Sequence, residues 1–399
     1  MWRTTRQRPS YAYTRKVPCK IHQPRWTYSC TYAEPEKLTH KGGYHPPFSI
    51  SNSYFTNILK KNVNTLFTNQ YSQEPNGEGD IIDIRSIPTL FGLQEARKLT
   101  KFSTGHINST FLAECGNKKY VLQSINKSVF QSPRVVMDNI SRIEKAFADI
   151  SDISVPHYIS CGEKNYAVVN DDLWRIYCYI PSTSNAAIDV ITAGRLFGSF
   201  IRIMDEWELN PTPVIDGFHD FDRYFATLSS KNGVDLNILT KLDKFRDTLE
   251  QVFTGSIKKR IIHGDAKPDN IIIGGTPTII DLDTVMRGYV AIDYGDLVRS
   301  VCQGKELNIQ QVREITQGFL QGLERLITTG EVNTLYYGVL WLTSELAVRY
   351  LIDSLSEVKY FRGKSSADCL TRAEELLRQL DMFTAHQEEL KYVILSETD

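Results

Sequence analysis

Short runs of apolar residues in the second quarter of the chain alternate with polar positions and end at turn residues, which is typical of β-strands. The Gly116-Asn117 pair between two of these runs predicts a tight hairpin turn. The predicted strands cover residues 96–102, 109–115, 118–125, 166–169 and 173–180. The first three predict a β-meander.

Helical periodicity follows the meander. Ser132 and Pro133 predict a helix start, since Ser is a good N-cap and Pro suits the first helical position. Apolar residues then recur every three or four positions from Val136 to Ile150. Beyond residue 183 similar periods predict helices over 190–204, 236–253, 307–328, 333–354 and 365–383.

This order predicts an α+β fold with two lobes. We expect an N-terminal β-sheet lobe with one helix over residues 81–181 and a mainly α-helical C-terminal lobe over 182–399, with the hinge at Pro181 to Thr183. Residues 1–80 are rich in Pro, Tyr, Ser and Thr and form a basic extension, of which 1–50 are expected to be disordered and 51–70 to contain a helix.

Charge and cysteine content narrow the class of protein. The first 50 residues carry a net charge of +7, whereas residues 187–399 carry −9, so no basic footprint for nucleic acid covers the folded part. The seven cysteines are widely spaced and include no CxxC pair, which favours the reducing cytoplasm over a disulfide framework or a zinc site. No apolar run is long enough to predict a membrane-spanning helix.

The candidate chemistry lies in residues 261–283, IIHGDAKPDNIIIGGTPTIIDLD. Asp265 is followed five residues later by Asn270, and Asp281 follows a predicted hairpin. Phosphoryl transfer from ATP to a hydroxyl needs a carboxylate to orient the hydroxyl and oxygen ligands for Mg2+. We therefore predict Asp265 as the catalytic residue and Asn270 and Asp281 as the metal ligands. His263 is expected to brace the loop.

The segment resembles the aminoglycoside phosphotransferase and choline kinase family, small-molecule kinases with the two-lobed protein-kinase-like fold. That resemblance implies an ATP-dependent kinase with an alcohol acceptor. It places a phosphate-covering turn between the first two strands, which contains the predicted nucleotide-binding residues Gly105, Asn108 and Ser109. Gln123, on the third strand, is the fourth predicted nucleotide-binding residue. Gln123 stands where protein kinases have Lys. Without that Lys, Glu144 is expected to be a solvated helix charge.

Further segments, among them 105–111, 121–126, 280–286 and 345–353, resemble the N-acetylhexosamine 1-kinase branch, in which Gln at this position is expected. That match implies that Arg349 and Tyr360 contact a sugar substrate and that Asp265 faces its anomeric hydroxyl. Asp283 and Asp296 are second candidates for substrate or loop contacts. Glu345, Arg349 and Asp353, spaced by four, suit a salt-bridge ladder on one helix equally well.

Three functions remain open from the sequence. A sugar kinase of carbohydrate metabolism comes first, an aminoglycoside or choline kinase is the enzymatic alternative, and a non-catalytic nucleotide-binding scaffold would also explain Gln123 and the long extension. The expected partners are ATP, Mg2+ and a small sugar, with no nucleic acid and no membrane. The oligomeric state and the identity of the acceptor are not determined by these patterns.

Overall fold

The computed structural model describes residues 83–102, 107–182, 188–207, 210–253, 255–304, 306–361 and 363–398. These described residues belong to one compact unit. The expectations for the N-terminal extension and for Gly105 lie outside the described residues, and the predicted boundary at residue 181 stays a prediction. Below, the small lobe means described residues 83–182 and the large lobe means described residues 188–398.

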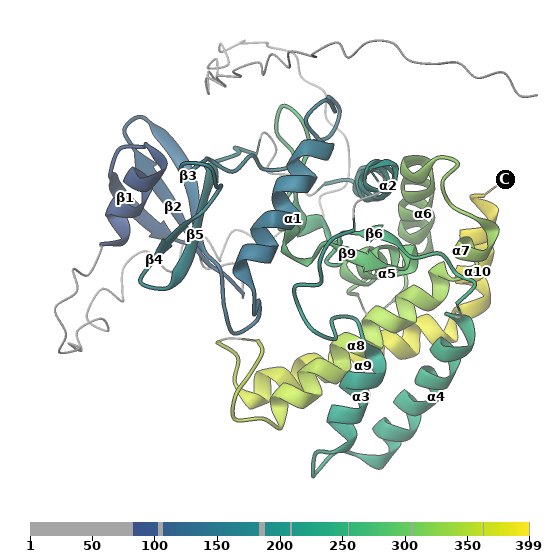
Figure 1. Cartoon of the computed structure of the whole chain (residues 1–399). Helices are drawn as coiled ribbons and strands as arrows, with labels where there is room; N and C mark the ends of the chain where they lie inside the picture. The colour runs from purple at the N-terminus through teal and green to yellow at the C-terminus, as the bar shows by residue number, and fades with distance from the viewer. Residues whose placement is uncertain are drawn as a thin grey trace, which may run out of the picture. The chain divides into compact units, whose positions relative to one another are not determined.

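The small lobe contains a five-stranded antiparallel sheet in the order β1-β2-β3-β5-β4 (Figure 1). A 3-10 helix, η1, precedes the sheet, and helix α1 follows the third strand. Their bounds are η1 Ile84–Phe91, β1 Ala96–Lys101, β2 Ser109–Cys115, β3 Lys118–Ser124, α1 Pro133–Ala146, β4 Ala167–Val169 and β5 Asp172–Cys178. The predicted meander is thus confirmed.

The two faces of this sheet have different surroundings, because successive residues of a strand point to opposite faces. Leu122 and Ile176 lie on the face that packs beneath η1. Val121 and Tyr177 belong instead to the core shared with α1 and the large lobe. Alternation therefore places Gln123 and Arg175 on the face of the sheet that looks toward α1.

The large lobe is mainly α-helical, and short strand pairs carry its loops. β6 pairs with β9 and β7 pairs with β8, both antiparallel. The helices are α2 Val190–Glu206, α3 Phe221–Ser229, α4 Leu236–Val252, α5 Val290–Val301, α6 Ile309–Leu323, α7 Thr329–Val332, α8 Leu335–Ser354, α9 Ser366–Ala385 and α10 Gln387–Ser396. The strands and 3-10 helices are β6 Arg260–Ile262, η2 Pro268–Asn270, β7 Ile271–Ile272, β8 Thr278–Ile279, η3 Leu282–Thr284 and β9 Met286–Gly288.

Helices α2 and α6 approach each other closely, and glycine allows it. A Cβ atom on Gly318 would lie 2.0 Å from the carbonyl oxygen of Ile191, so any side chain there would push the helices apart. Of the two, α2 packs on β6, the strand that leads into the Asp265 loop.

The predicted α+β architecture is confirmed, with differences at particular elements. Helix α5 was not predicted from the pattern, and almost all of its residues are buried, including the polar residues Asp293, Asp296 and Arg299. Helix α1 ends at Ala146, four residues earlier than its apolar period, and buried Phe147 caps it. Among the described residues no helix is long and apolar enough to cross a membrane. The cytoplasmic location stays a prediction.

Candidate active site

The loop that carries Asp265 follows β6 and turns sharply at Gly264. Gly264 has φ +78°, and a Cβ atom there would lie 2.6 Å from the carbonyl oxygen of Thr284. Glycine adopts this left-handed conformation at little cost, whereas a side chain would be both strained and obstructed. This geometry explains why the motif is His-Gly-Asp, since the Arg of the protein-kinase loop would not fit here.

Buried groups on both sides brace this loop. The Asp293 carboxylate accepts hydrogen bonds from the backbone N–H groups of His263 (2.7 Å) and Gly264 (2.8 Å). His263 Nε2 lies 3.0 Å from the carbonyl oxygen of Ile280, to which it can donate. Burial lowers the pKa of His263, so its imidazole is neutral and suited to bracing, as expected.

Asp265 is held by two donors from the next turn. Lys267 Nζ and Asn270 Nδ2 lie 2.7 Å and 2.9 Å from its Oδ2 atom. Burial would raise the pKa of Asp265, but Lys267, with Asn270, holds that pKa below its usual range. The carboxylate is therefore ionised and oriented, and it is only partly buried.

The β7–β8 hairpin brings Asn270 and Asp281 to the same end of the loop. Ile271 pairs with Ile279, and the backbone N–H of Ile280 donates to the carbonyl oxygen of Asn270 (2.9 Å). Asp281 has left-handed backbone angles (φ 62°, ψ 54°), and its residue surface is exposed. Even so, burial of its carboxyl group among protein atoms raises the pKa of that group to about 7, and the nearby carboxylates of Asp283 and Asp265 add to the shift.

Asp283 lies in η3, two residues beyond Asp281, and binds protein groups. Arg175 Nη1 and Nη2 donate to its two oxygens at 2.5 Å and 2.9 Å, and Asn108 Nδ2 donates at 2.7 Å. Arg175 Nε donates to Gln123 Oε1 (3.0 Å). Asp283 is 2% exposed, so the expectation that it contacts a substrate is corrected to a role in joining the lobes.

Asp296 is also committed to a protein cation. It lies on α5, is buried, and accepts from Arg299 Nε at 2.9 Å and from Arg299 Nη2. Although Asp296 is close enough to influence the pKa of Lys267 and His263, its carboxylate is neutralised within its own helix. The expectation of a direct substrate contact is corrected here as well.

Arg349 and Tyr360 come together near Asp265. The Arg349 guanidinium lies 4.6 Å from the centre of the Tyr360 ring, and Asp265 influences the pKa of both side chains. The aromatic cage, as we call the rings around Arg349, also includes three members at 5.4 to 5.6 Å, namely Phe218, Tyr224 and Phe361.

Asp353 orients the Tyr360 side of this cage. Its carboxylate accepts from the backbone N–H groups of Tyr360 (3.1 Å) and Phe361 (2.8 Å). The suggested ladder on α8 is therefore only partly present, since Arg349 lies 3.6 Å from Glu345 but Asp353 holds the following loop.

A buried His219–Glu345 pair connects α8 to the Asp265 loop. His219 Nδ1 lies 3.2 Å from the Glu345 carboxylate oxygens, and its Nε2 lies 2.9 Å from the carbonyl oxygen of Gly264. Burial lowers the pKa of His219, but Glu345 and the Gly264 carbonyl outweigh it and raise that pKa. A protonated His219 can donate from both nitrogens, which ties the loop to the helix that carries Arg349.

Sequence reasoning missed Lys267 and Arg175. The available signals were the position of Lys267, two residues after the predicted catalytic Asp265, and the position of Arg175, inside the apolar strand run 173–178. It was also wrong about Glu144, whose side chain is 14% exposed and accepts from the backbone N–H of Tyr158 (2.7 Å). Glu144 therefore braces the segment after α1 and is not a solvated charge.

The chain is similar to known phosphotransferases. The model of the phosphotransferase enzyme family matches residues 98–326, more than half of the chain. A microcompartment-associated aminopropanol kinase superposes with TM-score 0.61 at 16% identity, covering 77% of this chain and 97% of that one. An amicoumacin kinase in complex with AMP-PNP and Ca2+ gives TM-score 0.56 at 13% identity, covering 75% and 94%.

A choline kinase from Cryptosporidium parvum gives TM-score 0.50 at 14% identity, covering 74% of this chain and 92% of that one. At these identities the solved structures show that the fold is shared. The expected resemblance to the aminoglycoside phosphotransferase and choline kinase family is thus confirmed at the level of the family and its kinase-like fold, and this chain belongs to the phosphotransferase enzyme family.

Proposed function

We propose that the protein is an ATP- and Mg2+-dependent kinase that phosphorylates a hydroxyl of an uncharged sugar, of N-acetylhexosamine 1-kinase type. The observation that carries this proposal is the convergence of Asp265, Lys267 and Asn270, through hydrogen bonds of 2.7 Å and 2.9 Å, beside the Arg349 cage. The first group suits phosphoryl transfer, and the cage suits recognition of an acceptor without a positive charge.

Asp265 is the proposed catalytic residue. Its carboxylate accepts the proton of the attacking hydroxyl and orients that oxygen, which is the usual task of a carboxylate in this reaction. Lys267 keeps Asp265 ionised and places a positive charge beside the oxygen that is to attack. Arg349 adds a second cation on the acceptor side, so anionic charge that develops there is stabilised.

The side chains of Asn270 and Asp281 suit the binding of a divalent cation. Burial and then the neighbouring carboxylates of Asp283 and Asp265 raise the pKa of Asp281 to about 7, so a cation at Asp281 would stabilise its charged form. No cluster of three or more His, Cys, Asp or Glu side chains in the described residues is arranged to hold a metal alone. Such a site suits Mg2+, which takes one or two protein ligands and completes its shell with phosphate oxygens and water.

When bound, Mg2+ would neutralise charge on the β and γ phosphates. We assign Asn270 and Asp281 as its protein ligands. The side chains of Asn108 and Gln123 are bonded to Asp283 and Thr110, respectively, so we assign the phosphate contacts to Ser109 and to backbone N–H groups of the turn before β2. Gly105, predicted to belong to that turn, lies outside the described residues.

The acceptor assignment rests on the charge of the Arg349 cage. Aromatic cages bind cationic ligands through the negative faces of their rings. Here Arg349 itself occupies that position, with four ring centres within 5.6 Å. A cationic acceptor such as choline would meet a like charge, whereas sugar hydroxyls and an acetamido oxygen could accept hydrogen bonds from the guanidinium.

The deciding experiment measures ATP consumption with a panel of hexoses, N-acetylhexosamines, choline and aminoglycosides. We expect turnover with an uncharged sugar, and Asp265→Asn should lower kcat by about 10²- to 10⁴-fold while ATP binding is retained in a thermal-shift assay. Asp269→Asn is the matched control, since Asp269 is an exposed carboxylate in the same segment and should be dispensable.

Each other outcome contradicts a different part of the proposal. Turnover with choline or an aminoglycoside alone would show that the acceptor assignment is wrong. Nucleotide binding with no turnover on any member of the panel would favour the scaffold function. Activity of Asp265→Asn equal to that of Asp269→Asn would remove Asp265 from the reaction.

A further inference from the structure

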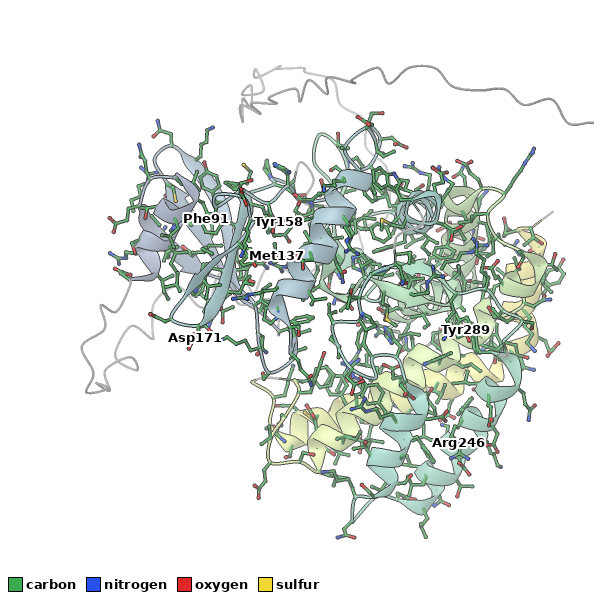
Figure 2. The ribbon with its side chains drawn as sticks, viewed as in Figure 1. Phe91, Met137, Tyr158, Asp171, Arg246 and Tyr289 are labelled. Carbon is green, nitrogen blue, oxygen red and sulfur yellow. The ribbon has the colours of Figure 1, made fainter. Side chains whose placement is uncertain are left out.

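Arg175 is a buried cation on β5, the strand next to the position where protein kinases carry Lys. Gln123 of β3 and Arg175 of β5 are direct cross-strand partners. The side chain of Arg175 is 1% exposed, and Met137 Sδ and the Tyr158 ring lie 3.9 Å and 5.2 Å from its guanidinium. Figure 2 shows Met137 and Tyr158 on the α1 side of the sheet.

The charge of Arg175 is neutralised by its hydrogen-bond partners within the protein. Two of its nitrogens donate to the two oxygens of Asp283, and the third donates to Gln123 Oε1. A bidentate pair with a carboxylate is the strongest neutralisation that a guanidinium can find among side chains. Because this pair is buried, Arg175 cannot reach a ligand and must act through Asp283.

Asp283 belongs to the loop that carries Asp281. Asp281 holds left-handed backbone angles, which non-glycine residues keep only when their surroundings enforce them. Two residues later, Asp283 is tied to the small lobe by Arg175. One residue further, Thr284 Oγ1 donates to the carbonyl oxygen of His263 (3.0 Å), which ties the same loop to the Asp265 loop.

The same carboxylate also reaches the turn before β2. Asn108 Nδ2 donates to Asp283, and Asn108 Oδ1 accepts from the backbone N–H of Asn126 (3.1 Å). One carboxylate thus connects β5, the phosphate-covering turn and the Asp281 loop. Glu144 takes no part in this connection, since its oxygens bind the backbone N–H of Tyr158 and the amide of Asn165.

We propose that Arg175 is a positioning residue, which sets the Asp281 loop against the small lobe through Asp283. This inference deepens the proposed function and rests on it, since the position of Asp281 matters to turnover only if Asp281 holds the cation. It also explains Gln123. A neutral side chain there accepts from Arg175 Nε, whereas Lys would place a second cation against a buried guanidinium.

The test measures the affinity for Mn2+ in the presence of AMP-PNP, from the electron paramagnetic resonance signal of free Mn2+. Arg175→Met should raise the apparent Kd for Mn2+ by about 10- to 100-fold, the range found when residues that orient metal ligands from outside the coordination shell are removed. Arg175→Lys should restore part of that loss. AMP-PNP binding without metal should change little.

A second variant separates positioning from folding. Arg175→Met alone leaves Asp283 buried without its cation, whereas Arg175→Met with Asp283→Leu replaces the pair by apolar side chains that can pack. The double variant should fold and still bind Mn2+ weakly. If it folds and keeps the wild-type affinity for Mn2+, the positioning role of Arg175 is overturned.

Arg260 is the matched control. It is 2% exposed and makes a bidentate pair with Glu331 at 2.6 Å and 2.9 Å, so Arg260→Met breaks an equally buried pair. It should lower Tm comparably and leave the Mn2+ affinity of the folded protein unchanged. An equal loss of affinity in Arg260→Met would mean that general destabilisation, and not Arg175, is responsible. If the wild type itself binds no Mn2+ with AMP-PNP, the proposed function fails together with this inference.

Discussion

Arg175 and Arg349 are both buried arginines near the Asp265 loop, but their surroundings differ. Arg175 is 1% exposed and forms a bidentate pair with Asp283 at 2.5 Å and 2.9 Å. The side chain of Arg349 is 11% exposed and reaches its nearest carboxylate, that of Glu345, only at 3.6 Å. Aromatic rings supply most of its contacts.

The difference decides what each cation can do. A carboxylate in direct contact neutralises a guanidinium, whereas aromatic faces attract it without cancelling its net charge. The Glu345 carboxylate is moreover shared with His219 and with Trp341 Nε1, which donates at 3.1 Å. Arg175 is therefore committed to structure, whereas Arg349 keeps its positive charge, as the proposed contact with the acceptor requires.

The largest effect that separates the two arginines should be on stability. Arg175→Met leaves the Asp283 carboxylate buried without its partner, so we expect the free energy of unfolding to fall by about 3–5 kcal/mol. Arg349→Met keeps an apolar side chain against the rings and should cost less than about 2 kcal/mol. Urea unfolding followed by tryptophan fluorescence measures both, and equal losses would contradict the comparison.

The next effect should appear in catalysis and be confined to the acceptor. Arg349→Met removes charged hydrogen bonds to the sugar, each contributing about 1.5–3 kcal/mol, so kcat/KM for the sugar should fall by about 10- to 100-fold. The KM for ATP should not change. Arg372→Met, at the half-exposed ion pair with Glu375, is the control and should behave as wild type. A higher KM for ATP in Arg349→Met would show that this cation serves the nucleotide instead.

A smaller effect on stability should follow when Lys, the residue that protein kinases have at this position, replaces Gln123. Gln123→Lys deprives Arg175 Nε of its acceptor, which should cost about 1–3 kcal/mol of stability, and the added charge should not tighten ATP binding. Gln123→Glu keeps an acceptor oxygen and should cost less. Thermal unfolding and the KM for ATP test this pair. Tighter ATP binding by Gln123→Lys at unchanged Tm would mean that Gln123 and Arg175 are not coupled.

The smallest effect concerns Glu345, whose carboxylate lies near both Arg349 and His219. Burial lowers the pKa of His219 and Glu345 raises it, so Glu345→Gln should lower that pKa. Imidazole titration by NMR measures it. In the wild type, stability from the raised His219 pKa is fully present below its unfolded value and is lost as pH rises through the folded value.

The lowered pKa of Glu345 acts in the opposite direction, so its contribution is lost as pH falls through the folded value of that carboxyl. The pair should therefore stabilise the protein most between the unfolded pKa values of the two groups. In Glu345→Gln this maximum should disappear from a plot of Tm against pH. An unchanged His219 pKa in the variant would show that the Gly264 carbonyl, and not Glu345, controls the histidine.

Much of the architecture was predictable, because strand and helix periods are local. The predicted bounds of β2 coincide with those of the structure, and the Ser132-Pro133 start of α1 is also as predicted. Helix α5 was not predicted: its polar residues Asp293, Asp296 and Arg299 are buried against protein groups, which the sequence pattern does not reveal.

The candidate site was predictable where its residues are near one another along the chain. Asp265 and Asn270 lie five positions apart, and a single turn brings the amide of Asn270 to 2.9 Å from the carboxylate. Asp283 and Asp296 look equally available in the sequence, but their partners are Arg175 and Arg299. A carboxylate's role depends on whether a cation meets it, and periodicity contains no information about that.

By itself, then, the sequence determined most of the strands and helices and indicated the candidate loop at Asp265, because backbone preference and short spacing act within a few residues. Only the tertiary structure decided that Asp283 joins the lobes, since its partner Arg175 is 108 positions away and meets it only when β5 packs near η3. It likewise decided that Arg349 is enclosed by rings from separate segments and keeps its charge. Which charges are neutralised is a property of long-range packing.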